Sequence, residues 1–302
     1  MLTAVSQALA LLVSAGSFGA GAVDAELAAM TPREKAAALV VSGLPAPADA
    51  GGVLVQRWNR HLPRPRGALV YTDQEGGTVK TFPELPPAHA ASQYATAAEA
   101  RRDGAATAAA LRRIGVNVDL APVLDTPDGP LGSRHYSSAE LGLAFARGLG
   151  RAGCVKHFPG LGSTPESTDE ARVHGVVRKR DLAPFRAAIR AGVPCVMVGH
   201  AIYPRLGSRR ASLEPATYRL LRRLGFKGVV ITDSLGVLQS PYAPYWARLA
   251  LTAGADLVLT TNGRDAGRMI DALMPLARRG ELDAKVARVL RYRRSLGVAP
   301  AR

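Results

Sequence analysis

The chain has 302 residues, of which 47% are hydrophobic and 21% charged, as in an ordinary globular protein with a substantial core. No apolar run reaches the roughly 18 residues that a membrane-spanning helix needs, so we expect no integral membrane span. The formal net charge is +15, but the cations are mostly arginines in scattered pairs. They form no basic tail with interleaved aromatics, so nucleic-acid binding is not favoured.

The first 27 residues form a segment of their own, with an apolar centre at 8–15 and small residues at 20–22. This segment lacks the basic region with which a signal peptide begins. An atypical signal peptide and a plain N-terminal helix both fit it, so the sequence does not choose between the cytoplasm and the cell envelope. Residues 28–302 are expected to form one domain, because no linker-like composition interrupts them.

Short, continuously apolar runs rich in Val and Leu recur along the chain. They are residues 37–41, 51–55, 67–77, 116–125, 153–158, 194–200, 228–234 and 255–259. Such runs are typical of parallel strands buried on both faces. Most of them are separated by helix-like stretches, namely residues 97–114, 138–152, 181–191, 215–224 and 243–253. Residues 265–302 predict one or two closing helices.

This alternation of strand and helix predicts an α/β fold, a (β/α)8 barrel of the TIM type. An open doubly wound sheet is the alternative, but the sequence has no GxGxxG after the first strand and no GxxxxGK[ST]. Asp181 is expected to cap the helix at 181–191, and Gly192 to end it. Cys154 and Cys195 each begin an apolar run, and we expect two separate buried thiols rather than a disulfide or a zinc site.

Charged or imidazole side chains end four of the predicted strands. They are Asp73, Lys156 with His157, His200 and Asp233. In a (β/α)8 barrel the carboxyl ends of the strands meet at one mouth, so these side chains are expected to converge there. Asp73, Lys156 and His157 could hold a polyhydroxylated ligand through charge-assisted hydrogen bonds. A carboxylate on a rigid strand end, such as Asp233, suits the nucleophile of a retaining glycosidase, which needs a proton donor about 5 Å away.

A metal site is the competing prediction for the same mouth, because His157, His200, Asp73 and Asp233 are all possible ligands. Barrel metallohydrolases usually carry His-x-His on the first strand, and the run at 37–41 contains no histidine. We therefore expect neither a metal nor another cofactor.

Several segments resemble, in the same order, the catalytic barrel of family 3 glycoside hydrolases, and above all the single-barrel bacterial β-N-acetylhexosaminidases. The segments include YTDQEGGTVKTF (71–82), GSRHYSS (132–138), KHFPGLG (156–162) and GFKGVVITDSLGV (225–237). The resemblance implies a retaining β-glycosidase that hydrolyses terminal β-linked N-acetylglucosamine or a similar sugar. It also implies a covalent intermediate on Asp233.

The resemblance further implies a set of sugar-binding residues around this nucleophile. Asp73 matches an aspartate that grips sugar hydroxyls, and Arg134 matches a sugar-binding arginine that could equally brace its own loop. Lys156 and His157 match a Lys-His pair that contacts the sugar, and His200 matches a histidine that lines the pocket. The expected ligand is an oligosaccharide or a cell-wall glycan fragment, and the chain is expected to act as a monomer.

The sequence departs from this family where the proton donor should stand. In the single-barrel hexosaminidases KHFPGHG leads into a loop that ends in Asp-Ser-His, whose histidine is the general acid and base. The ungapped counterpart here is Ser-Thr-Asp at 167–169, and Leu161 replaces the second histidine of KHFPGHG. Asp169, Glu166 and His174 are the three candidate replacements.

Two arginines of the family's EGGRVxR stretch are also replaced, by Thr78 and Thr81. The alternative function is therefore a barrel that binds a saccharide but cleaves it weakly or not at all. Retention of Asp233 favours the enzyme, whereas loss of the Asp-Ser-His loop favours the binding protein.

Overall fold

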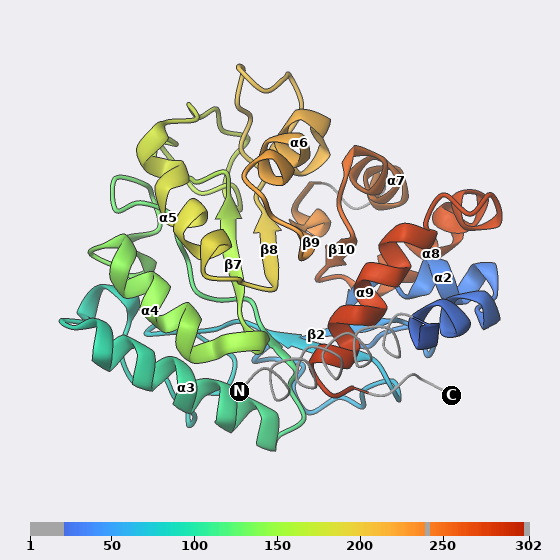
Figure 1. The fold of residues 1–302 in the computed structure, drawn as a ribbon, viewed down its shortest axis with the longest axis horizontal. Helices are drawn as coiled ribbons and strands as arrows, with labels where there is room; N and C mark the ends of the chain where they lie inside the picture. Colours follow the sequence, from blue (N-terminus) through green and yellow to red (C-terminus); the bar gives the residue numbers. More distant parts are fainter. Residues whose placement is uncertain (1–20, 239–241, 299–302) are drawn as a thin grey trace, which may run out of the picture.

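The structure is a computed structural model that describes residues 21–238 and 242–298. Its centre is an eight-stranded parallel sheet, part of which is labelled in Figure 1. The strands lie in the order β6-β3-β2-β1-β10-β9-β8-β7. The strands are β1 (Val40–Gly43), β2 (Gly52–Val55), β3 (Leu69–Thr72), β6 (Val118–Asp119), β7 (Cys154–Phe158), β8 (Cys195–Val198), β9 (Val229–Ser234) and β10 (Leu257–Thr260). Isolated bridges from Asp119 to Gly153 and from Val123 to Lys156 join the two end strands. The sheet is therefore a nearly closed barrel, as predicted.

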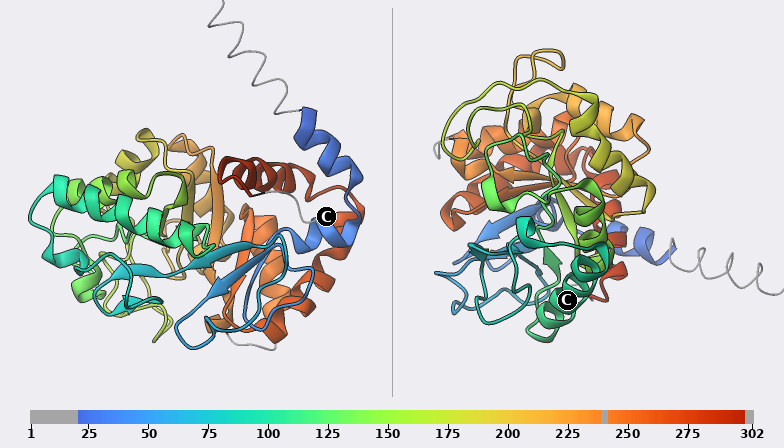
Figure 2. Two further views of the ribbon diagram at one scale, coloured as in Figure 1. Left: turned by 90° about the horizontal axis from the view of Figure 1, so that it is seen from below. Right: turned by 90° about the vertical axis from the view of Figure 1, so that its left-hand side faces the viewer.

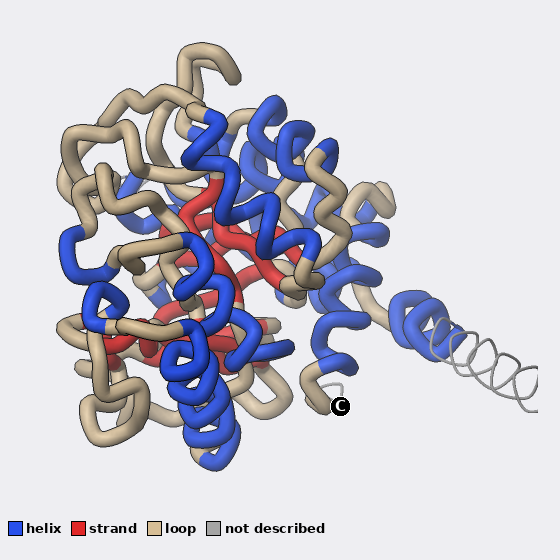
Figure 3. The backbone as a smooth tube through the Cα atoms, turned by 60° about the vertical axis from the view of Figure 1, so that its left-hand side comes forward, coloured by secondary structure: helices blue, strands red, loops and turns tan. Residues whose placement is uncertain are grey.

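Helices pack around the outside of this barrel (Figures 2 and 3). They are α2 (Pro32–Ala37), α3 (Ala97–Arg113), α4 (Ala139–Leu149), α5 (Lys179–Arg190), α6 (Pro215–Arg223), α7 (Ala243–Ala253), α8 (Gly263–Arg278) and α9 (Asp283–Ser295). The connections at 44–51 and 56–68, on either side of β2, are turns and loops. A short hairpin of β4 (Gln74–Gly76) and β5 (Val79–Lys80) follows β3.

The strands are buried along their whole length, which explains why they read as unbroken apolar runs. Every residue of β1, β2, β3, β7 and β8 is buried. Helices cover one face of the sheet and side chains fill the barrel interior, so neither face meets water. The polar residues that chemistry requires can therefore lie only at the strand ends.

Helix α5 begins earlier than the sequence predicted, and Asp181 does not cap it. The N-cap residue is Arg178, and Asp181 lies buried within the first turn. Its carboxylate accepts hydrogen bonds from Arg178 and from the hydroxyl of Thr126, at 2.7 to 2.9 Å. Gly192 does end the helix, with a φ of 80° that suits glycine just beyond the C-cap.

The prediction of two separate thiols was wrong, because Cys154 and Cys195 form a disulfide. The two residues are direct partners in the parallel register of β7 and β8, with their Cα atoms 4.4 Å apart. This distance is within bridging range. The sequence showed that each cysteine begins an apolar run, but it did not show that the two runs are neighbours in register.

The N-terminal segment predicted at 1–27 lies largely outside the described residues, which begin at residue 21 with a helix over 21–29. Among the described helices, none combines the length and the apolar character that crossing a bilayer requires.

Candidate active site

Side chains from four strands meet at the carboxyl end of the barrel. Asp73 directly follows β3, Lys156 and His157 lie in β7, His200 comes two residues after β8, and Asp233 lies near the end of β9. This is the face at which barrel enzymes carry their active sites. The structure thus brings together the polar side chains that we expected to converge at the ends of the strands.

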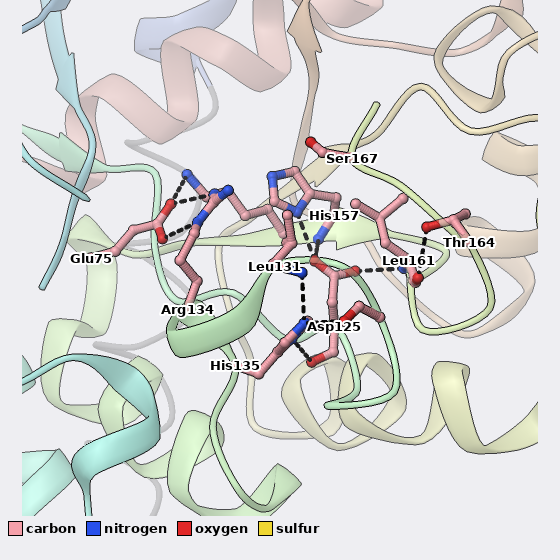
Figure 4. Close-up of polar contacts among 12 residues, drawn as sticks. Glu75, Asp125, Leu131, Arg134, His135, His157, Leu161, Thr164 and Ser167 are labelled. Carbon is pink, nitrogen blue, oxygen red and sulfur yellow. Dashed lines mark hydrogen bonds and ion pairs between the residues drawn. The ribbon is translucent and has the colours of Figure 1, made fainter. Parts of the chain in front are cut away.

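A buried ion cluster forms one side of this mouth. The Lys156 ammonium lies 2.6 Å from Asp73 Oδ1 and 2.7 Å from Glu75 Oε1. Arg134 donates two hydrogen bonds of 2.8 Å to the Glu75 carboxylate (Figure 4). Burial alone would raise the pKa of Glu75, but Lys156 and Arg134 together lower that pKa to about 2. Glu75 is therefore a permanently charged bridge between the two cations.

Asp125 organises the other side of the cluster. Its Oδ2 accepts hydrogen bonds from the His157 ring Nδ1 at 2.7 Å and from the His157 backbone at 3.2 Å. Its Oδ1 accepts the Leu161 N–H at 2.7 Å, and its backbone carbonyl lies 3.1 Å from His135 Nδ1 (Figure 4). One buried carboxylate thus fixes the imidazole of His157 and the beginning of the loop that follows β7.

His200 lies fully buried beside Asp233. Its Nε2 is 2.9 Å from the Ser234 carbonyl and its Nδ1 is 2.7 Å from the Ser212 hydroxyl. A carbonyl can only accept, so Nε2 carries the proton and Nδ1 accepts from Ser212. Burial lowers the pKa of His200 despite the nearby Asp233 carboxylate, so the ring takes up a positive charge only toward the acid range in which Asp233 itself titrates.

Asp233 and Asp169 have carboxyl groups whose pKa values move in opposite directions. Burial by itself would raise the pKa of Asp233, but His200 and His157 hold it below its ordinary value. The Ser234 N–H also donates a 2.8 Å hydrogen bond to Asp233 Oδ1. Desolvation and the negative charge of Asp233 raise the pKa of Asp169. The loop residue Asp169 thus lies within the electrostatic field of the mouth, although its side chain is exposed.

The other two candidate proton donors lie on the outside of the same loop. Glu166 is exposed near the tip. His174 is also exposed, and its backbone pairs with Ile202 in the segment after β8. The positive charges that lower the pKa of Asp233 are those of His200, His157 and Lys156. Those that act on Asp169 are His157, Arg134 and His200. Asp169 is thus the candidate whose carboxyl pKa responds to the charges of the strand-end residues.

Sequence reasoning missed three acidic residues of the cluster. Glu75 and Asp125 have the contacts described above. Asp119, at the end of β6, is fully buried and accepts the Gln74 N–H at 2.9 Å, while its Oδ2 has no hydrogen-bond partner among the described residues. Burial raises the pKa of Asp119 to about 8. Glu75 stands in the segment 71–82, and Asp119 and Asp125 stand in the apolar run 116–125, but only the folded chain shows that they face Lys156, His157 and Arg134.

Neither threonine that replaces an arginine of the family's EGGRVxR stretch is accompanied by a cation that takes the arginine's place. Thr78 is exposed in the β4–β5 hairpin, and Thr81 is buried with its hydroxyl 3.4 Å from the Val55 carbonyl. The nearby Lys80 donates to the Pro83 carbonyl at 2.9 Å. Over residues 21–238 and 242–298, no three His, Cys, Asp or Glu side chains are grouped so that they could hold a metal ion.

Comparison with known proteins matches this arrangement to one family. The model of the glycosyl hydrolase family 3 N-terminal domain matches residues 55–292. A β-hexosaminidase of Stenotrophomonas maltophilia (strain K279a) is 36% identical over 225 residues, covering 65% of this chain and 67% of that protein.

Two solved structures show the same likeness. The family 3 glycosyl hydrolase of Mycobacterium smegmatis is 31% identical with a TM-score of 0.76, covering 91% of this chain and 99% of that one. The family 3 β-N-acetylglucosaminidase of Paenibacillus sp. FPU-7 is 28% identical with a TM-score of 0.79, covering 91% of this chain. This chain spans 64% of the length of the Paenibacillus protein. The chain therefore belongs to glycosyl hydrolase family 3, as the order of its motifs predicted, and within that family it is of the β-hexosaminidase type.

Proposed function

We propose that the protein is a retaining β-glycosidase that releases terminal β-linked N-acetylglucosamine, or a similar sugar, from an oligosaccharide or a cell-wall glycan fragment. Asp233 is the nucleophile and Asp169 is the general acid and base. The observation that carries this proposal is the position of Asp233 near the end of β9, in the same mouth as the ion cluster around Lys156, and the opposite displacement of the two carboxyl pKa values supports the two roles. When the pKa values of two carboxyl groups are displaced in opposite directions, the group with the lower pKa can act as the ionised nucleophile and the other as the protonated acid.

The reaction needs two displacements at the anomeric carbon. In the first, an Asp233 oxygen bonds to that carbon while the bond to the leaving oxygen breaks, and the proton of Asp169 passes to the leaving oxygen. In the second, Asp169, now a carboxylate, takes a proton from water as the water oxygen displaces Asp233. The sugar is released with its β configuration retained, and both aspartates return to their starting protonation states.

The ion cluster is suited to hold the sugar in place for these steps. The Asp73 side chain is 29% exposed and that of Arg134 is 21% exposed, whereas the side chains of Lys156 and Glu75 are nearly inaccessible. The exposed oxygens and guanidinium nitrogens can meet sugar hydroxyls, while the buried partners fix their orientation. His157 offers Nε2 to the same space, because Asp125 occupies Nδ1.

A saccharide-binding protein without turnover is the second candidate function. One observation favours it: Asp169 is exposed, and no described side chain hydrogen-bonds its carboxyl group. A general acid is usually held in place more firmly. Such a protein would keep the ion cluster but would cleave nothing.

Hydrolysis of an aryl β-N-acetylglucosaminide with an activated leaving group tests the two candidates. We expect slow but measurable turnover that Asp233→Asn abolishes. Asp169→Ala should lose activity on a substrate with a poor leaving group. On the activated substrate azide should speed up its turnover, because azide attacks the glycosyl-enzyme without help from a general base. Absence of turnover by the unmutated protein, together with measurable binding of N-acetylglucosamine, would instead establish the binding protein.

A further inference from the structure

The outer surface of α3, α4 and α5 is strongly basic. These three helices follow one another in the chain and lie side by side on the outside of the barrel (Figure 1). Gly148 of α4 packs so closely on α3 that a Cβ at this position would lie 2.3 Å from the carbonyl oxygen of Arg101. Among the exposed charged residues that the structure describes in these helices and in the turn at 150–152, only Glu140 is acidic. We call this surface, formed by α3, α4, the turn and α5, the basic face.

Helical spacing places the arginines of the basic face in rows. On α3 they are the pairs at 101–102 and 112–113, which are eleven residues apart and exposed. Eleven residues correspond to about three helical turns, so the two pairs lie on the same side of α3. Arg186 and Arg190 are four residues apart on α5 and are exposed in the same way. The arginine pairs that are scattered in the sequence thus gather on one surface of the folded chain.

A cavity of about 400 Å³ lies within the basic face, where α4 and α5 end beside the end of α9. Arg147 and Arg151 line it together with the small residues at 191–192, and its lining contains no acidic residue among those described. Arg190 directly precedes this lining. The helix dipole favours a cation in the last turn of α4 and of α5, which Arg147 and Arg190 provide, but it does not account for Arg151. The cavity therefore has the size and the charge to seat one anionic group.

Most cations of the basic face have no acidic partner. Arg180 pairs with Asp128 at 2.7 Å, but among the residues it describes the structure shows no ion pair for the arginines of α3, of α4 and the turn, or for the last two of α5. By contrast, Arg33 of α2 binds both Asp49 and Asp271. Like charges held on one surface create a positive potential that attracts a polyanion, and release of the counterions of that polyanion favours binding.

The composition of the basic face favours a flexible polyanion over a membrane or a nucleic acid. None of the large hydrophobic side chains that are exposed in the described residues lies in α3, α4 or α5. A protein that binds at a membrane surface inserts apolar side chains, and one that binds single-stranded nucleic acid stacks bases on aromatic rings. A rigid duplex would touch the convex outside of a barrel over a short length only. A flexible chain of anionic groups can follow that surface from one row of arginines to the next.

We propose that the basic face binds an anionic cell-wall polymer whose units are joined by phosphodiesters, with one phosphate seated in the cavity between Arg147 and Arg151. A planar guanidinium recognises the two free oxygens of a phosphodiester through two parallel hydrogen bonds. The choice of a cell-wall polymer rests on the proposed function, because the glycan that Asp233 would cleave belongs to the same material. The basic face lies on the side of the barrel and the mouth lies at the carboxyl ends of the strands, so a bound polymer leaves the mouth open. The polymer would thus hold the protein close to its substrate.

Calorimetric binding of poly(glycerol phosphate) at several salt concentrations tests the basic face. The test variant replaces four of its arginines by glutamine, as Arg147→Gln, Arg151→Gln, Arg186→Gln and Arg190→Gln. The control variant removes four exposed arginines of α6, α7 and α8, as Arg219→Gln, Arg223→Gln, Arg248→Gln and Arg264→Gln. The two variants have the same net charge and differ only in where the charge was lost.

We expect the test variant to bind the polymer about tenfold or more weakly and the slope of log Kd against log salt to fall by about three, because four phosphate contacts are lost. The control variant should keep most of the affinity and of the slope. A second variant that replaces the four arginines at 101–102 and 112–113 should also weaken binding, and it keeps the test valid if the first variant folds poorly. An equal loss of affinity in the test and control variants would overturn the proposal.

Competition experiments decide which polyanion the basic face prefers. Poly(glycerol phosphate) should displace duplex DNA that carries the same number of phosphates, and vesicles of phosphatidylglycerol should bind more weakly than the polymer. Tighter binding of the duplex or of the vesicles would overturn the assignment to a cell-wall polymer.

Turnover of an aryl β-N-acetylglucosaminide by the same variants separates this proposal from the proposed function. The test variant should keep the kcat/KM of the unmutated protein on this small substrate, because the basic face lies away from the mouth. If the unmutated protein cleaves nothing but binds the polymer through the basic face, the binding surface stands and the enzyme does not. If the protein cleaves the aryl substrate yet does not bind the polymer, the enzyme stands and the binding surface falls.

Discussion

The carboxylate of Asp125 holds His157 by both its ring Nδ1 and its backbone N–H. This contact is one link of a closed ring. Asp125 joins His157 to His135, and Glu75 joins Lys156 to Arg134. Because His157 follows Lys156 and His135 follows Arg134 in the chain, two acidic residues cross-link two cationic dipeptides. The ring fixes the side of the mouth that carries Lys156 and His157 from four separate segments.

Asp125→Asn should damage catalysis more than the loss of one hydrogen bond suggests. Both Asp125 oxygens accept from N–H groups, so an amide nitrogen at either position would face a donor. We expect unfolding to become easier by about 1–3 kcal/mol, since a buried donor is left unsatisfied. We also expect kcat/KM to fall by about 100-fold, because a displacement of His157 by about 1 Å disturbs the bound sugar.

Asp256→Asn is the matched control for this change. Asp256 is equally buried and accepts the Val230 N–H at 2.9 Å, an Arg222 guanidinium at 2.9 Å and the guanidinium of Arg288, but it lies at the opposite end of the barrel, just before β10. Asp256→Asn should lower the free energy of unfolding by at least as much and leave kcat/KM unchanged. A similar loss of activity in both variants would mean that Asp125 acts on stability alone.

The pH dependence of kcat/KM should carry the signature of two carboxyl groups. Asp233 must be ionised to attack, so activity rises as pH climbs through its lowered pKa. Asp169 must be protonated to donate, so activity falls as pH climbs through its raised pKa. The falling limb should appear with a poor leaving group and vanish in Asp169→Asn. A falling limb that persists unchanged in Asp169→Asn would assign the acid to another group.

The strands could be predicted from the sequence because each is buried on both faces. This burial makes β1, β2, β8 and β10 unbroken apolar runs, and any polar residue at their ends stands out. The run at 116–125 was predicted too long, since β6 covers only Val118–Asp119. Pro122 has no N–H to give to a neighbouring strand, and the chain beyond it leaves the sheet.

The ring of polar contacts could not be predicted in the same way. Glu75 and Arg134 are 59 residues apart, and Asp125 and His157 are 32 apart. The sequence around each residue is recognisable, but it does not show which carboxylate contacts which cationic or imidazole side chain. The buried Nη1 of Arg210, which has no hydrogen-bond partner among the described residues, is harder still to predict, because the sequence does not show which acceptors the fold places near it.

Glu75 makes stability depend on pH in the acid range. Its pKa falls from 4.5 to about 2 in the folded protein, so the stabilisation is complete above 4.5 and is lost as pH falls toward 2. The difference corresponds to about 3 kcal/mol. Glu75→Gln should flatten this part of the curve in denaturant titrations and weaken the protein at neutral pH, since Lys156 and Arg134 lose their bridge. Glu84→Gln breaks a surface pair with Arg60 at an exposed carboxylate and should change this part of the curve much less than Glu75→Gln does.

The disulfide between Cys154 and Cys195 should contribute strongly to stability, because it closes a long stretch of chain. The two cysteines are 41 residues apart in sequence, and a loop of that size corresponds to about 4 kcal/mol in the chain-entropy description. Cys154→Ala with Cys195→Ala should lower the melting temperature by several degrees, and the intact protein should resist reductants until it unfolds, since both residues are fully buried. The bridge lies at the amino ends of β7 and β8, away from the mouth, so kcat/KM at low temperature should not change. Free thiols in the denatured, unreduced protein would show that the bridge does not form.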